Sequence, residues 1–172
     1  SVVHVREPGG TDLGEALREV LLDQARSPDA VVEACLFSAS RRTLLEEVVR
    51  PAMAEGKVVV CERYVGSTWA YQGVAGGAGT DLVRALETAA CGGLDPDLVV
   101  LLDMDPLRAA NRQTGEDDHF ESRSPKFHDA VRAAFLDLAE LRGWSVVDAS
   151  VSTQEVAEAV WTSVAARIGD AS

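Results

Sequence analysis

Short apolar runs alternate along the chain with longer segments in which apolar residues recur at helical spacing. Strands followed by helices in this order are typical of an α/β domain with a mostly parallel sheet. The predicted strands cover residues 2–5, 58–61, 98–102 and 145–147. Residues 58–61 are continuously apolar, so we predict that this strand is buried on both faces.

Two helical segments follow the first predicted strand. Leu13, Leu17 and Leu21 recur every fourth residue and predict an amphipathic helix. A second helical stretch covers residues 30–54, and Pro51 within it is expected to kink or loosen the last turns because proline lacks a backbone N–H. Gly56 is a plausible end for this helix.

A long loop separates the last two predicted strands. Residues 113–125 are polar, acidic and without periodicity, which favours a mobile loop of the kind that acts as a lid. The next helix is expected to start near Pro125, because proline is favoured in a first helical turn.

The composition indicates one domain over residues 1–172. The chain is 47% hydrophobic and shows no repeat, linker or low-complexity segment. Its longest strongly apolar run, residues 98–102, is much shorter than the roughly 20 residues of a membrane-spanning helix, so no membrane contact is expected.

Charge and cysteine content restrict the partners and the compartment. A net charge of −12 repels nucleic acid and anionic membranes at long range, although a local arginine cluster can still bind a small anion. Cys35, Cys61 and Cys91 are few, far apart and set in apolar surroundings. We therefore expect buried thiols and a cytoplasmic protein.

Charged residues follow two of the predicted strands, at the edge of the sheet where α/β proteins bind ligands. The segment from Arg6 to Thr11 reads REPGGT, and turn formation alone would also account for its glycines. Glu62 and Arg63 follow the strand at residues 58–61. Arg63 has the geometry to clamp a phosphate, while the alternative is a surface ion pair between Glu62 and Arg63.

A second group of residues suits recognition of a nucleoside. Phe37 and Arg41 share a helix face and could stack on a base and bond its edge, although a phenylalanine in an apolar helix is more often core. Thr68, Tyr71 and Gln72 bring hydroxyl, phenol and amide groups into one short segment. Such a segment can read a sugar and a base, or can simply cap a helix.

The glycine-rich phosphate loop of many nucleotide-binding α/β proteins is not found. No G-x-x-x-x-G-K-[ST] occurs in the 172 residues, and Lys57 follows a lone Gly56 directly into a predicted strand.

Taken in order, the motifs resemble the bacterial thymidylate kinase family over nearly the whole chain. The shared motifs are REPGGT at 6–11, LFSASRR at 36–42, ERY at 62–64, AYQG at 70–73, PDL at 96–98, LDMDP at 102–106 and KFH at 126–128. The resemblance implies a P-loop-kinase-like fold of three layers, a parallel sheet with helices on both faces. It also implies a central first strand and a phosphate loop that are not in this chain. Without that strand, we expect residues 1–172 alone to fold poorly and to transfer no phosphoryl group.

The resemblance also implies a function and roles for particular residues. The activity would be phosphorylation of dTMP to dTDP with ATP and Mg²⁺, in a protein that is commonly a homodimer, with the helix face of residues 30–54 as a candidate interface. Implied roles are stacking on thymine for Phe37, reading of its edge for Arg41 and Gln72 with Thr68 beside them, exclusion of a 2′-hydroxyl for Tyr71, binding of the monophosphate for Arg63 and Arg18, and contact with the sugar and acceptor phosphate for Glu7. Residues 113–125 match the lid.

Two positions depart from the family pattern. Glu62 stands where the family has aspartate, so a role near magnesium or the phosphates would need a longer side chain, and a shift of about 1 Å can cost about 100-fold in rate. His119 stands in the lid where the family commonly has arginine, and a histidine is only partly protonated near neutral pH. Arg112 or Arg123 could supply the missing positive charge instead.

Three functions are therefore considered. The first is a thymidylate kinase, favoured by the complete base and sugar pocket. The second is a degenerate nucleotide-binding or regulatory module, favoured by Glu62, His119 and the absent phosphate loop. The third is a kinase for another monophosphate or deoxynucleoside, which should not reproduce Phe37, Arg41, Tyr71 and Gln72 together.

Overall fold

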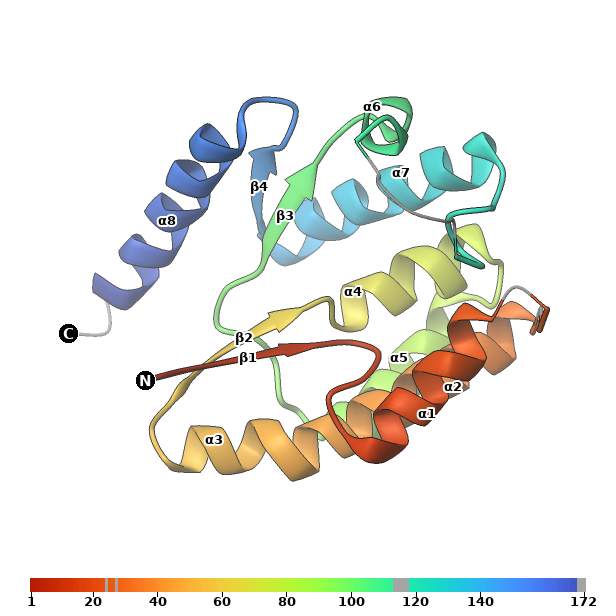
Figure 1. Cartoon of the computed structure of the whole chain (residues 1–172), viewed down its shortest axis with the longest axis horizontal. Helices are drawn as coiled ribbons and strands as arrows, with labels where there is room; N and C mark the ends of the chain where they lie inside the picture. Colours follow the sequence, from red (N-terminus) through yellow and green to blue (C-terminus); the bar gives the residue numbers. More distant parts are fainter. Residues whose placement is uncertain (24, 27, 113–117, 170–172) are drawn as a thin grey trace.

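The computed structural model describes residues 1–23, 25–26, 28–112 and 118–169, and its elements follow the order expected of an α/β protein (Figure 1). The first half contains β1 (Val2–Arg6), α1 (Asp12–Leu22), α2 (Ala30–Leu44), the π-helical turn η1 (Leu45–Val49), α3 (Arg50–Ala54) and β2 (Val58–Glu62). The second half contains α4 (Val65–Thr68), the π-helical η2 (Trp69–Ala75), α5 (Thr80–Cys91), β3 (Val100–Asp103), α6 (Pro106–Ala110), α7 (Pro125–Arg142), β4 (Ser145–Asp148) and α8 (Thr153–Gly169).

The strands form two parallel pairs. β1 pairs with β2, with Val2 opposite Val58 and Arg6 opposite Glu62, and β3 pairs with β4, with Val100 opposite Ser145. Within the described residues β2 and β3 are not hydrogen-bonded to each other. In Figure 1, β3 and β4 lie between α8 on the left and α7 on the right, whereas α1, α2, α3 and α5 lie below β1 and β2. The parallel α/β architecture predicted from the alternation of elements is confirmed.

The prediction that residues 58–61 are buried on both faces is wrong. Val58 and Val60 of β2 are 53% and 48% exposed. A strand is covered on both faces only when neighbouring strands and helices enclose it, and in the described chain β2 has β1 as its sole strand neighbour. The same edge leaves Cys61 exposed, and Cys35 lies on the outer surface of α2, so only Cys91 is the buried thiol that the sequence predicted.

The long helical segment changes its hydrogen-bond pattern just before Pro51. The helix continues from α2 into η1, where the Arg50 N–H reaches back to the Leu45 carbonyl rather than to the fourth preceding residue. Pro51 follows in the first turn of α3 and has no N–H to donate. Gly56, with φ of 71°, directly follows the last cap residue of α3 and lets the chain turn toward β2.

Local signals set the helix starts near the ligand edge. The Thr11 side chain accepts a hydrogen bond from Gly14 N and caps α1. Ser124 caps α7 in the same way through Phe127 N, and Pro125 is its first residue, as predicted. None of the described helices is long and apolar enough to cross a membrane.

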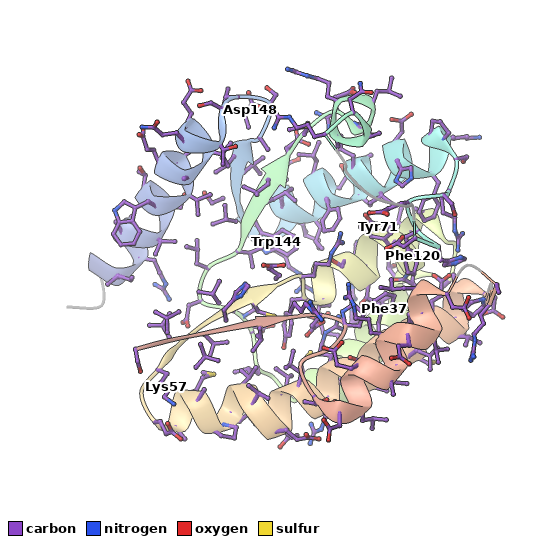
Figure 2. The ribbon with its side chains drawn as sticks, viewed as in Figure 1. Phe37, Lys57, Tyr71, Phe120, Trp144 and Asp148 are labelled. Atoms are coloured by element: carbon purple, nitrogen blue, oxygen red, sulfur yellow. The ribbon has the colours of Figure 1, made fainter. Side chains whose placement is uncertain are left out.

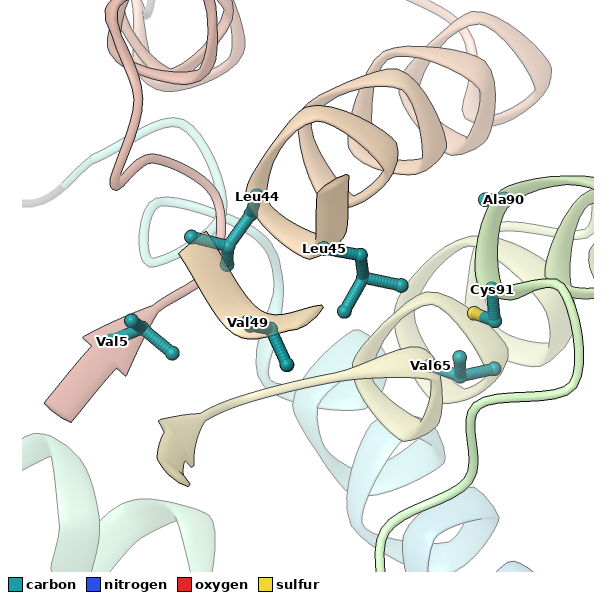
Figure 3. Packing of buried hydrophobic residues seen from close by; sticks show 7 residues of the cluster. All are labelled: Val5, Leu44, Leu45, Val49, Val65, Ala90 and Cys91. Carbon is teal, nitrogen blue, oxygen red and sulfur yellow. The ribbon is translucent and has the colours of Figure 1, made fainter. Parts of the chain in front are cut away.

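Two apolar clusters position the site. A small one joins η2 to α7 through Ala70, Val131 and Ala134, with Tyr71 packed against it, and Figure 2 shows Tyr71 close to the labelled Phe120 and Phe37. The larger cluster joins the end of β1 to η1, α4 and α5 (Figure 3). Its buried members are Val5, Leu44, Leu45, Val49, Val65, Ala90 and Cys91. Because the larger cluster includes Val5 at the end of β1, Val65 shortly after β2 and Leu44 of α2, it holds the segments that follow β1 and β2 close to α2.

Candidate functional site

A cavity of about 240 Å³ lies where the loops after β1 and β2 meet α1, α2, η2 and the segment 118–121. Parallel strands present their carboxyl ends to one edge, and this edge is where α/β proteins bind ligands. The lining residues are Glu7, Pro8, Arg18, Leu22, Phe37, Arg41, Arg63, Tyr64, Ser67, Tyr71, Gln72, Asp118, Phe120, Glu121 and His128.

Glycines allow the loop after β1 to approach α1 and α2 closely. Gly9 N donates to Ser40 Oγ at 3.1 Å, and Gly10 N donates to Glu15 Oε1 at 2.8 Å. Gly9 and Gly10 have φ of 131° and 82°, which side-chain-bearing residues rarely adopt. A Cβ on Gly14 would lie 2.9 Å from the Gly9 carbonyl oxygen. The glycines of the REPGGT segment thus form a tight turn that also holds Glu7 at the cavity.

Glu7, Arg41 and Thr68 form a buried polar group at the base of the cavity. Arg41 Nε donates to Glu7 Oε2 at 2.8 Å, and Arg41 Nη2 donates to Thr68 Oγ1 at 3.0 Å. Glu7 Oε1 is buried and has no hydrogen-bond partner within the described chain. Burial raises the pKa of Glu7, and the nearby Arg41 charge opposes that rise. An unpaired buried acceptor beside a cavity is suited to a donor group on a ligand.

Two guanidinium groups reach the cavity from different elements. Arg18 Nη1 donates to the Pro8 carbonyl oxygen at 3.0 Å, which fixes the α1 side chain across the loop after β1. Arg63 follows β2 with a left-handed φ of 66°, and its guanidinium carbon lies 5.6 Å from the centre of the Tyr71 ring. Both arginines line the cavity, so the two side chains that the sequence analysis associates with a phosphate lie at the same cavity.

An aromatic wall lies on another side of the cavity. The Phe37 and Phe120 rings are 5.7 Å apart, and the Tyr71 and Phe120 rings are 5.9 Å apart in an edge-to-face arrangement. Phe37 therefore lines the cavity rather than the apolar core, which answers the alternative left open by the sequence. Tyr71 is also supported from behind by Phe127 and Phe135.

Sequence reasoning missed Glu33, which is 2% exposed in α2. Its Oε1 contacts His119 Nε2 and accepts from Arg123 Nη2, both at 2.9 Å, and its Oε2 accepts from Gln72 Nε2 at 2.9 Å. A signal was present, because Glu33, Phe37 and Arg41 are four residues apart and share one helix face. A lone glutamate inside the apolar VVEACLF segment is the feature that points to it.

The residues predicted to belong to the lid contact different parts of the structure. His119 and Arg123 meet Glu33, and Asp118 Oδ1 accepts from the backbone of Phe120 and Glu121, which shapes this turn. Arg112 instead donates to carbonyl oxygens of Ala149, Ser150 and Val151. Residues 113–117 of the predicted lid lie outside the described part of the chain.

Glu62, predicted as a catalytic group and metal ligand, lies apart from the cavity lining. Its Oε1 is 2.9 Å from His4 Nε2 on the neighbouring strand β1, so Glu62 forms a surface pair with His4 and not with Arg63, which was the alternative considered from the sequence. Among the described residues no three His, Cys, Asp or Glu side chains are grouped so as to hold a metal ion.

Cationic groups, an aromatic wall and a buried amide around one cavity at the carboxyl ends of parallel strands define a nucleotide-binding α/β protein.

Comparisons with known proteins identify the family. Residues 1–160 match the family model described as thymidylate kinase. A thymidylate kinase of Symbiobacterium thermophilum is 46% identical over 158 residues, which cover 90% of this chain and 74% of that protein. Those of Deinococcus radiodurans and Solidesulfovibrio magneticus are 43% and 42% identical, with 97% and 94% of this chain and 83% of each relative covered. This chain belongs to the thymidylate kinase family.

Proposed function

We propose that this protein transfers the γ-phosphoryl group of ATP to the phosphate of dTMP, giving dTDP and ADP. The observation that carries the proposal is the cavity that gathers Phe37, Arg41, Gln72, Arg18 and Arg63. The family supports the reaction, since the relatives that match most of this chain are named thymidylate kinases.

The chemistry of the lining residues suits the parts of dTMP. Phe37 offers a ring for stacking on thymine, while Arg41 and Gln72 offer donors and acceptors for its edge. Arg18 and Arg63 offer paired N–H groups for the monophosphate, and we assign the unpaired Glu7 Oε1 to a sugar hydroxyl. Thr68 fixes the position of Arg41 by accepting a hydrogen bond from its Nη2.

Phosphoryl transfer of this kind depends on positioning and on fixed charge around the moving group rather than on a covalent intermediate. We propose that Mg²⁺ arrives with the ATP phosphates, since Mg²⁺ usually keeps several waters and few protein ligands. Glu62 would have to leave His4 to take part.

We also propose a homodimer that uses the outer face of the α2 to α3 segment. Val31, Val32 and Met53 are 45%, 44% and 45% exposed on this segment, so they offer apolar side chains that a second copy of the chain could cover. Sedimentation of the protein and of a Val32→Lys variant tests this, and equal masses for both would contradict it.

The function is tested with the protein expressed from its complete coding sequence. A coupled assay of ADP release should show turnover that requires dTMP, ATP and Mg²⁺ together. Calorimetry should show tighter binding of dTMP than of dUMP by a modest margin, since one methyl group in an apolar pocket contributes about 1–3 kcal/mol. Tight dTMP binding without turnover would instead indicate a nucleotide-binding module, and equal affinity for dTMP and dCMP would contradict the proposed base recognition.

A further inference from the structure

The buried Glu33 carboxylate connects the cavity wall to the lid segment. One oxygen accepts from the Gln72 amide nitrogen, and the other contacts His119 and accepts from Arg123. We propose that Glu33 is a positioning residue that fixes which end of the Gln72 amide faces the base, so that the pocket selects a pyrimidine with a hydrogen on N3. This inference rests on the proposed function, because it concerns how the same cavity reads dTMP.

The orientation of Gln72 follows from the chemistry of its partner. A carboxylate that accepts hydrogen bonds from a guanidinium has only acceptors to offer, so the amide NH₂ of Gln72 must face Glu33. A reversed amide would place two oxygens in contact in a buried site without a donor between them, which is strongly unfavourable. Gln72 is 1% exposed and lines the cavity, so water cannot easily replace the missing donor.

Because the NH₂ group of Gln72 donates to Glu33, its carbonyl oxygen is available to accept a hydrogen bond from a ligand in the cavity. Thymine and uracil carry a hydrogen on N3, which an amide oxygen accepts, whereas cytosine presents an unprotonated N3 that repels it. Discrimination therefore depends on a residue that does not line the cavity itself. Gln72 makes the hydrogen bond to the base, and Glu33 determines whether the oxygen or the NH₂ of the Gln72 amide faces the base.

Replacing Glu33 by Gln should reverse this arrangement. The Arg123 guanidinium can only donate, so it needs the carbonyl oxygen of the introduced amide, and the amide NH₂ is left for Gln72. The Gln72 amide must then turn its own oxygen toward the introduced NH₂ and its own NH₂ toward the base. An NH₂ group favours the acceptor N3 of cytosine. The expected effect is a fall of at least about tenfold in the preference for dTMP over dCMP.

The experiment is calorimetry of the protein from its complete coding sequence with dTMP, dCMP and N3-methyl-dTMP. The N3-methyl compound isolates the N3 hydrogen, because it leaves both ring carbonyls in place. In the unchanged protein dTMP should bind more tightly than either analogue. In E33Q the difference in affinity between dTMP and each analogue should become smaller. The matched control is Arg123→Gln, which loosens the lid segment but leaves the contact between Glu33 and Gln72, so the preferences should be retained.

A double variant keeps the test decisive if E33Q folds poorly. E33Q/Q72E exchanges the amide and the carboxylate while preserving their hydrogen bond, and the new carboxylate at position 72 again offers an acceptor to N3. The preference for dTMP should return. The role of Glu33 would be overturned if E33Q kept the full preference for dTMP over both analogues. It would also be overturned if the double variant failed to regain that preference. Equal affinity of the unchanged protein for dTMP and dCMP would instead overturn the proposed function.

Discussion

Arg41 Nε donates a hydrogen bond to Glu7 Oε2 across 2.8 Å, and both side chains are almost completely buried. Burial raises the pKa of Glu7, while the charge and the hydrogen bond of Arg41 act to lower it. The ion pair thus joins the loop after β1 to α2 at the cavity, and its loss should be visible in stability as well as in binding.

Replacing Arg41 by Met should lower the free energy of unfolding at neutral pH by about 3–5 kcal/mol, because a buried carboxylate loses its partner. This loss of free energy of unfolding should become smaller as the pH is lowered, because protonation removes the charge of Glu7. A glutamate with a raised pKa contributes stability that is fully present below its unfolded-state pKa and is lost as pH rises through its folded-state pKa. R41M raises that pKa further, so its stability should fall more steeply with pH than that of the unchanged protein.

Urea unfolding at several pH values between about pH 4 and pH 8 measures this dependence. The R41M/E7Q double variant should lose the additional pH dependence, since no titrating carboxyl remains at position 7. Arg26→Gln, which removes an exposed pair with Asp23, is a control that should cost less than about 1 kcal/mol. A penalty for R41M that is independent of pH would show that Glu7 is not its source.

Replacing Phe37 by Ala should weaken dTMP binding by about 5-fold to 150-fold, because stacking of a base on an aromatic ring contributes about 1–3 kcal/mol. Deoxyribose 5-phosphate lacks the base and should bind the variant and the unchanged protein equally. Calorimetry with both ligands separates loss of stacking from general damage. Equal losses for the two ligands would mean that Phe37 supports the cavity without contacting the base.

Replacing Arg63 by Gln should weaken dTMP binding at least about tenfold, because a hydrogen bond to a charged group contributes about 1.5–3 kcal/mol. Thymidine has no phosphate, so its affinity should not change. Arg63→Lys should give an intermediate result for dTMP, since lysine keeps the charge but loses the bidentate geometry. If thymidine binding falls together with dTMP binding, Arg63 acts on the base or on the fold.

Replacing Tyr71 by Ala should narrow the difference in affinity between dTMP and ribothymidine monophosphate. The ring is expected to fill the space that a 2′-hydroxyl would need, and its removal also weakens the contacts with Phe120 and Phe127. Tyr71→Phe keeps the ring and should keep the discrimination. Unchanged discrimination in the alanine variant would assign Tyr71 to packing alone.

Local patterns in the sequence were enough to find most elements and several site residues. The leucines of α1, the first-turn Pro125 of α7 and the apolar runs located helices and strands because each signal depends on neighbours within one or two turns. Phe37, Arg41, Tyr71 and Gln72 were recognised through short motifs, and they do line one cavity. Each of those motifs is also a short run of consecutive residues, so it can be recognised without knowledge of the fold.

Only the tertiary structure decided which distant groups meet. Glu33 contacts Gln72 and His119 across separations of 39 and 86 residues, and Arg112 turns to residues 149–151 rather than to the cavity. The apolar run of β2 predicted a buried strand, but burial depends on what lies beside a strand, and Val58 and Val60 are exposed. Periodicity records the side of an element on which a residue lies, whereas packing selects its partner, because folding brings together positions that no local pattern relates.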